Sequence, residues 1–176
     1  MRTKFFLFAF IFLLLQLHFT LAQEKKQVVL KAQLWPYSSL CDFPETENQP
    51  GAISYNNVSI SVRGCEDLQQ ELGKPSAVRL TVINLSDSEI ECPFNGLKSV
   101  FVKMKNGKVA TSIAMRYKQK NPVGSGYYYS FANKVDGEMK FIIDPHKSCD
   151  VIFLFPKASA GDQINIEGFA SGKITD

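Results

Sequence analysis

The sequence predicts an all-β protein, a single antiparallel β-sandwich of eight or nine short strands, with a closed barrel as the alternative. Apolar residues recur at alternate positions in many short runs, which is the spacing of strands, and very few recur at helical spacing. Turn-forming Gly and Pro residues separate these runs. The composition fits this class, because the chain has 14 Phe and 6 Tyr, which suit the packed face of a sheet.

Each strand is predicted from its local pattern. The run 28–35 ends at Pro36, which has no backbone N–H to donate to a neighbouring strand. In 58–62 and 78–82, apolar residues alternate with polar ones. Later apolar and aromatic runs are bounded by the turn sequences VGSG, KVDGE, DPHKS and PKASAGD. Together with the hairpin described next, the predicted strands are 28–35, 58–62, 78–82, 100–104, 109–117, 127–131, 139–143, 151–155 and 164–166.

The clearest local element is a hairpin around the Asn-Gly pair at 106–107. Asn-Gly tolerates the positive φ values of a type I′ turn, so the sequence predicts a two-residue loop. This loop sets Met104 opposite Val109 and Val102 opposite Thr111. One face of the predicted hairpin is then apolar, as expected for a strand pair that covers a core.

Residues 1–22 predict a secretory signal peptide. The segment starts with basic residues, is apolar without a break over 5–15, and ends in small residues that suit cleavage before position 23. A membrane-anchoring signal is the alternative, but the apolar run is short for a membrane span. No cysteine follows the cleavage site, so no lipid anchor is indicated. We expect one mature domain, 23–176, without a transmembrane segment, secreted or in the periplasm.

Charge and histidine content argue against several function classes. Loss of Arg2 and Lys4 with the signal would leave 18 Lys and Arg against 17 Asp and Glu, so no general attraction to nucleic acid is expected. His146 would be the only histidine left, in a predicted turn. The chain has no nucleophile elbow, no H-E-x-x-H and no P-loop. We therefore expect a protein that is not an enzyme and uses no cofactor or metal.

A run of basic residues marks the candidate binding surface. No acidic residue occurs between Lys98 and Lys120, and the predicted pairing puts three of the lysines on one face with Phe101. Such a surface could hold an anionic glycan, an envelope component or a protein, although a merely solvated face is the simpler interpretation. Tyr128 is included in this predicted surface, because exposed tyrosines are common at recognition sites. The predicted surface comprises Lys98, Phe101, Lys103, Lys105, Lys108, Arg116, Lys118, Lys120 and Tyr128.

The four cysteines have spacings that match no zinc or redox motif. In an oxidising compartment an even number of cysteines predicts disulfides, and buried free thiols are the alternative. Four cysteines allow three connectivities, which spacing does not separate. Two Asn-x-Ser triplets, at Asn57 and Asn84, fit the glycosylation pattern.

Three segments carry a family resemblance: VRLTVINLS at 78–86, VFVKMKNGKV at 100–109 and FIIDPHKSCDVIFLFPK at 141–157. In their order and pattern they resemble bacterial extracellular immunoglobulin-like domains. The resemblance covers roughly residues 77–170 and implies an immunoglobulin-like sandwich with a binding or structural role. The strand order that it implies favours the disulfides Cys41–Cys92 and Cys65–Cys149.

These observations lead to an exported, non-catalytic binding or scaffolding module as the expected function. A secreted protease inhibitor is the second hypothesis, with an exposed loop from 36–56 or 119–126 entering a protease. A glycan hydrolase that uses paired carboxylates is the third. The third is disfavoured because the acidic residues cluster in predicted loops instead of at strand ends that face a cleft; these residues are Glu45, Glu47, Glu66, Asp67, Asp87 and Glu89.

Overall fold

The computed structural model describes residues 27–36, 52–63, 74–120 and 127–176, with side chains left out over 52–63, 117–120, 127–130 and 136–139. The predicted signal peptide, Cys41, Cys65 and most of both candidate inhibitor loops lie outside these residues. No helix in the described ranges has the length and apolar character to cross a membrane. The elements are β1 (Val28–Trp35), β2 (Ala52–Arg63), β3 (Ser76–Asn84), β4 (Ile90–Phe94), the 3₁₀ helix η2 (Leu97–Ser99), β5 (Val100–Lys103), β6 (Val109–Thr111), β7 (Ala114–Lys120), β8 (Tyr127–Ile143), β9 (Ser148–Phe155), β10 (Gln163–Ile166) and β11 (Ala170–Thr175).

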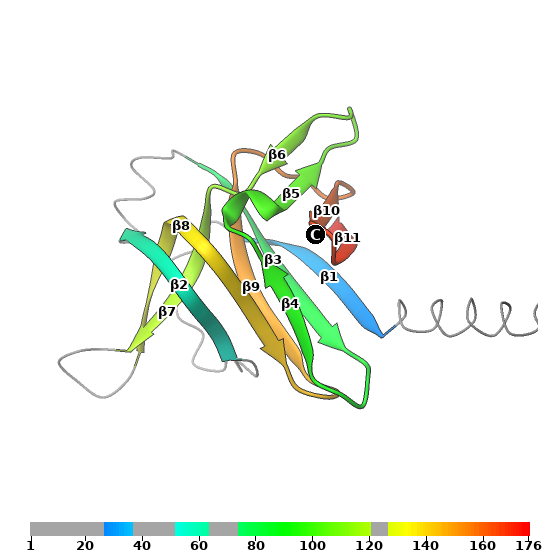
Figure 1. The fold of residues 1–176 in the computed structure, drawn as a ribbon. Helices are drawn as coiled ribbons and strands as arrows, with labels where there is room; N and C mark the ends of the chain where they lie inside the picture. Colours follow the sequence, from blue (N-terminus) through cyan, green and yellow to red (C-terminus); the bar gives the residue numbers. More distant parts are fainter. Residues whose placement is uncertain (1–26, 37–51, 64–73, 121–126) are drawn as a thin grey trace, which may run out of the picture.

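The all-β prediction is confirmed, but the described strands form one continuous sheet instead of two stacked sheets (Figure 1). The path runs β2-β8-β7-β9-β3-β1-β11-β10-β5-β6, and β4 pairs with β8 beside it. Every pair is antiparallel except β1 with β11. The path ends at β2 and β6, so the described sheet is open and not a closed barrel.

Strand β7 is the corner of this sheet. Its first residues, Ala114 and Met115, pair with β9, and Met115 also pairs with Ala132 of β8. Beyond this corner the long strand β8 pairs with β4. The β4–β8 part can therefore face the β9–β3–β1 part, and the core fills the space between them.

The rings of Phe94 and Phe153 join these two parts across the core, and Phe141 of β8 packs beside Phe94. Phe94 of β4 lies 5.7 Å from Phe141 and 5.5 Å from Phe153 between ring centroids, in tilted geometry. All three rings are buried and belong to the main apolar cluster. On β3 and β9, alternate residues enter this cluster and are matched across the ladder, as in the pair Val78 and Phe153.

A second, smaller apolar cluster lies on the other face of β3 and β9. Leu154 and Ile152 alternate with the residues that enter the main core, so they point the opposite way. They pack with Ala77, Ala114 and Phe131. Strand β9 is therefore buried on both faces over its C-terminal half, which explains its continuous apolar run.

The predicted strands are mostly found, with three differences. The runs 127–131 and 139–143 are parts of one strand, β8, and the predicted turn between them lies inside it. Two strands were not predicted, β4 and β11. The run 109–117 is split, because the chain leaves the hairpin after β6 and enters β7 at the corner of the sheet.

The predicted hairpin exists, but its register is wrong by one residue. The N–H of Gly107 donates to the carbonyl of Met104 at 2.9 Å, and the N–H of Met104 donates to Lys108 at 2.8 Å. Gly107 has φ +81°, so the loop has three residues with glycine in the left-handed position. The shift turns β6 over: Ala110 is buried and Val109 is 58 % exposed.

The predicted disulfides Cys41–Cys92 and Cys65–Cys149 are not formed in this structure. Cys92 and Cys149 are both free and buried in the main apolar cluster. Cys92 lies on β4 and Cys149 on β9, on the two sides of the core that the sheet encloses. The physical reason is that strand alternation turns both thiols into the core, where they pack as small apolar groups.

We expect Phe94→Ala to lower the free energy of unfolding by about 3–5 kcal/mol, because it leaves a cavity between two buried rings. Urea denaturation of the variant and of the unchanged protein measures this difference. Val109→Ala is the control, since an exposed side chain should change stability by no more than about 0.5 kcal/mol. Equal effects of both substitutions would contradict the role given to Phe94.

Candidate functional site

Lysines from strands far apart in sequence lie in one row on the outer face of the sheet. Lys103 of β5 is opposite Gln163 of β10, and Gln163 is in turn opposite Lys173 of β11. All three side chains are exposed. Neighbouring strands are about 4.8 Å apart, so Lys103 and Lys173 are separated by roughly 10 Å along the row.

The row continues onto β1. The parallel pairing of Ala32 with Ile174 places the preceding residues, Lys31 and Lys173, level with each other. Lys31 is exposed, whereas Ala32 and Ile174 are buried, as alternation along each strand requires. The basic row thus crosses β5, β10, β11 and β1.

The tip of the hairpin brings Lys105 to this row. The side chain of Lys105 lies over Gly161: a Cβ added there would be 2.6 Å from Lys105 Cε and 3.8 Å from Lys173 Cε. The N–H of Lys105 donates to Asp162 at 3.1 Å, and the other carboxylate oxygen of Asp162 accepts the N–H of Ser159 at 2.9 Å. The buried Asp162 carboxylate therefore holds the hairpin tip against the loop before β10.

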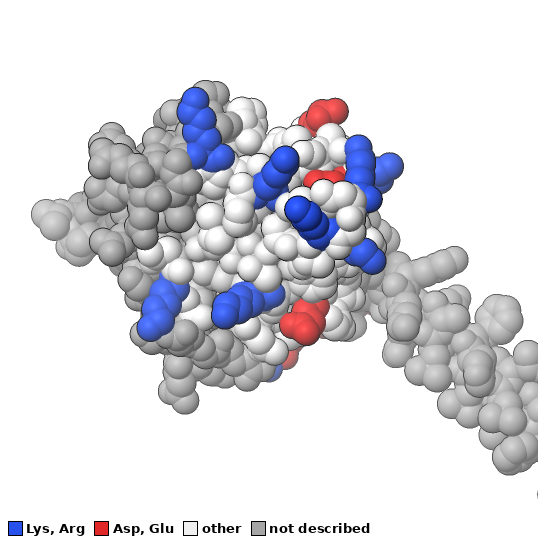
Figure 2. Space-filling view, turned by 90° about the horizontal axis from the view of Figure 1, so that it is seen from above, with Lys and Arg blue, Asp and Glu red and all other residues white. Residues whose placement is uncertain are grey.

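We call these four exposed lysines the basic surface. Figure 2 looks onto the end of the molecule that carries the hairpin, and more Lys and Arg than Asp and Glu side chains are visible there. Farther along the same face, Asp150 already pairs with Arg79. The basic surface comprises Lys31, Lys103, Lys105 and Lys173; the predicted residue Lys108 pairs with Met104 and so lies on the other face of the hairpin.

Some residues of the predicted binding surface are exposed in the structure, and others are buried or lie elsewhere. Lys98 is exposed on η2, and Phe101 is half-buried beside Lys103. Arg116 is a correction: it is only 6 % exposed and lies in β7, opposite Phe131 and away from the hairpin. The split of 109–117 into two strands is the reason. Lys118, Lys120 and Tyr128 lie on β7 and β8, where side chains are not described.

Sequence reasoning missed Lys31 and Lys173. They stand alone in their local sequence, and only the β1–β11 and β10–β11 pairings bring them to Lys103. Their positions on the exposed face of each strand could have been read from alternation. No local signal gives the strand order.

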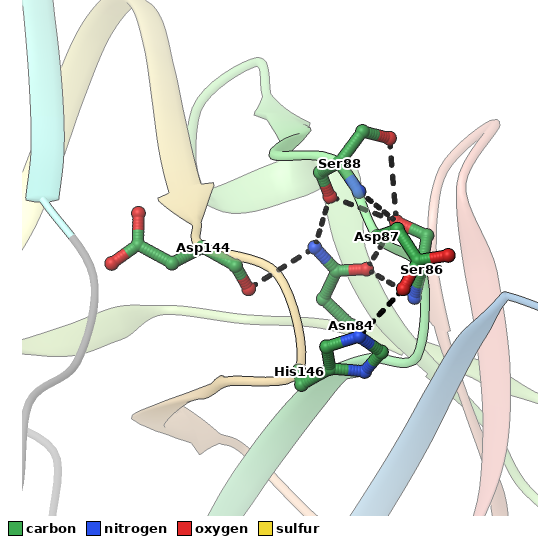
Figure 3. Close-up of polar contacts among 6 residues, drawn as sticks. All are labelled: Asn84, Ser86, Asp87, Ser88, Asp144 and His146. Atoms are coloured by element: carbon green, nitrogen blue, oxygen red, sulfur yellow. Dashed lines mark hydrogen bonds and ion pairs between the residues drawn. The ribbon is translucent and has the colours of Figure 1, made fainter.

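At the other end of the sheet, a polar corner forms around Asn84 (Figure 3). The Asn84 amide donates to the carbonyls of Ser88, Ile143 and Asp144 at 2.7, 3.0 and 3.1 Å. Asn84 Oδ1 accepts the N–H and the hydroxyl of Ser86 at 2.9 and 2.7 Å. Asn84 is fully buried, so this amide is structural, and a glycan on it is incompatible with the fold.

His146 lies at the edge of this corner in an exposed turn, with φ +58°. Its Nε2 is 2.8 Å from Asp87 Oδ1, and the Asp87 side chain is fully exposed. The Ser86 hydroxyl nearby lies against Asn84 and Ser88 instead of the imidazole. The pair resembles the orienting half of a catalytic triad, but the serine beside it is engaged elsewhere.

The surroundings of the two buried thiols, Cys92 and Cys149, decide whether they can act as nucleophiles. Burial away from water, together with the neighbouring Cys149, raises the pKa of Cys92 to about 12. Burial, with a smaller effect of Asp150, raises the pKa of Cys149 to about 12. Both thiols therefore stay protonated at neutral pH and are poor nucleophiles.

Metal ligands do not cluster in the part of the chain that the structure describes: no group of three His, Cys, Asp or Glu lies together there. Comparisons of the chain with protein-family models, curated proteins and solved structures returned no match. The functional argument therefore rests on the chain's own surfaces.

The raised thiol pKa values predict a loss of stability in alkali. The folded thiols keep their protons up to pH about 12, whereas unfolded thiols lose them near 9, so the unfolding free energy falls as pH rises through this interval. Alkali also acts on the rest of the protein, so the control is the double variant Cys92→Ala/Cys149→Ala. Its unfolding free energy, measured with urea, should fall less steeply; equal slopes would contradict the prediction.

We expect Asn84→Ala to lower the free energy of unfolding by about 2–4 kcal/mol, because three carbonyls lose their donor. Urea denaturation tests this. Leu85→Ala, at the exposed residue next to it, is the matched control and should change stability by no more than about 0.5 kcal/mol. An unchanged free energy of unfolding in Asn84→Ala would show that water can replace the amide at this corner.

Proposed function

We propose that this chain is an exported, non-catalytic binding module that holds an anionic polysaccharide on the basic surface. The observation that carries the proposal is the strand register that brings Lys103, Lys173 and Lys31 into one exposed row. The predicted signal peptide supports the location, and the resemblance to extracellular immunoglobulin-like domains supports a binding role. The relationship to immunoglobulin-like domains is itself part of the proposal.

The position of these lysines favours binding over protection of the sheet. Lysines on edge strands discourage pairing with other chains, which accounts for Lys108 beside the terminal strand β6. Lys173 and Lys31 lie on β11 and β1, which have neighbours on both sides. Edge protection gives no reason for cations there.

Electrostatics gives the surface an affinity for anions. The side chains of Lys105 and Lys173 approach the same point above Gly161, so their charges repel. The carboxylate of Asp162, which accepts the backbone N–H of Lys105, is buried and also accepts the backbone N–H of Ser159. A bound anion would lower this repulsion, and the interaction would weaken with salt.

The shape of the row fits a linear polyanion. Its lysines follow one another across four strands, a span of roughly 14 Å, so several successive charges of an extended chain could be met. The polar residues between the lysines, such as Gln163, supply hydrogen-bonding groups for sugar hydroxyls. An acidic polysaccharide offers both features.

The test is titration of polygalacturonate into the protein, followed by calorimetry. We expect Lys103→Gln/Lys173→Gln to weaken binding by about tenfold or more, since two charge contacts are lost. Lys74→Gln/Lys147→Gln, which changes the charge equally at exposed positions elsewhere, should bind like the unchanged protein. Binding should also weaken when the salt concentration rises from about 0.05 to 0.2 M.

Two results would overturn the proposal. Equal losses in both double variants would mean that only net charge matters. Binding that is the same for neutral dextran and for polygalacturonate would mean that the lysines do not recognise the anion.

A further inference from the structure

The row of outward-facing residues that carries the basic surface continues beyond Lys31 onto β3 and β9. Lys31 is opposite Thr81 of β3, and Thr81 is opposite Asp150 of β9. After the neighbouring cations Lys173 and Lys31, the row therefore presents a hydroxyl and then a carboxylate. The sheet continues past β9 to β7, so the run of cations is stopped by a change of side chains and not by an edge of the sheet.

Arg79 is the next cation after Lys31. It lies two residues before Thr81 on the same face of β3, which makes it a diagonal neighbour of Lys31, roughly 7–8 Å away between Cα atoms. Its guanidinium is already paired, because Nη2 donates to Asp150 Oδ2 at 2.5 Å. The Thr81 hydroxyl donates to the other oxygen of the same carboxylate, also at 2.5 Å. The charge of Arg79 is thus neutralised at the point where the row reaches it.

Trp35 also holds Arg79 on this face of the sheet. The Cζ atom of Arg79 is 5.5 Å from the centroid of the Trp35 ring, which is a cation–π contact. The side chain of Arg79 is 33 % exposed and that of Asp150 is 16 % exposed. Loss of the negative charge at Asp150 would therefore leave a guanidinium that stays beside Trp35, is open to solvent and has no compensating carboxylate.

We propose that Asp150 limits the length of anionic polysaccharide that the basic surface holds, by neutralising the cation that would continue it. This inference rests on the proposed function and adds a residue that sets its specificity. From β5 to β1 the lysines span roughly 14 Å, and an uncompensated Arg79 on β3 would extend the span to roughly 19 Å. Acidic groups of the polymer that lie beyond Lys31 gain no charge contact while Asp150 is paired with Arg79.

The test is calorimetric titration of polygalacturonate, and of galacturonate oligomers of increasing length, into the unchanged protein and into Asp150→Asn. We expect the variant to bind polygalacturonate about threefold more tightly, because it gains one partly exposed cation. The affinity of the variant should go on rising at oligomer lengths where that of the unchanged protein has become constant. Asp144→Asn, the same change at an exposed residue at the other end of the sheet, should bind like the unchanged protein.

Arg79→Gln tests the pairing without a change at Asp150. It should weaken the binding of polygalacturonate about threefold, because it leaves Asp150 as an uncompensated anion near Lys31. The double variant Arg79→Gln/Asp150→Asn has the net charge of the unchanged protein and should have its affinity. Weaker binding by the double variant would mean that Arg79 already contacts the polymer, and would overturn the proposal.

The outcomes separate the role of Asp150 from the proposed function. If the unchanged protein binds but Asp150→Asn gains nothing, gains as much as Asp144→Asn, or gains equally for short and long oligomers, only the role of Asp150 is overturned. If Asp150→Asn binds and the unchanged protein does not, the role of Asp150 stands and the proposed function is overturned. If neither binds, both are overturned.

Discussion

The packing of Phe94 against Phe141 and Phe153 is the interaction on which the rest of the structure depends. The hydrogen-bonded path between β8 and β9 passes through β7, which pairs with β9 at only two positions, Ala114 and Met115. So short a ladder cannot hold two parts of a sheet face to face. The rings of Phe94 and Phe153, 5.5 Å apart between centroids, make apolar contact across the gap, and Phe141 packs against Phe94 at 5.7 Å on the β8 side of the core.

Because successive residues of a strand point to opposite faces, the residues that fill this core also determine which residues lie on the outer face. Leu30 and Ala32 point inward on β1, so Lys31 points outward between them. The same parity places Lys173 outside and Ile174 inside on β11. The basic surface is thus a consequence of the register that fills the core, and a shift of one residue in any of these strands would bury a lysine.

Sequence patterns predicted what depends on neighbours along the chain and missed what depends on pairing. Alternation located β3, and the Asn-Gly pair located the hairpin at Gly107. The loop length was wrong, because Asn-Gly also suits a three-residue loop with glycine in the left-handed position. The turn predicted around Gly137 lies within β8, where ladder partners outweigh a weak local preference for a turn. Arg116 was assigned to the hairpin surface because the end of β6 has no signal in the sequence.

The two ends of the sheet differ in how their polar groups are satisfied, and this difference is the reason for proposing a binding surface at the hairpin end. At the Asn84 corner one amide makes five hydrogen bonds within the protein, so a ligand would have to replace contacts that already exist. At the hairpin end, Lys105 and Lys173 approach each other, and the buried Asp162 carboxylate accepts hydrogen bonds from backbone N–H groups. Cations that repel one another gain most from an external anion.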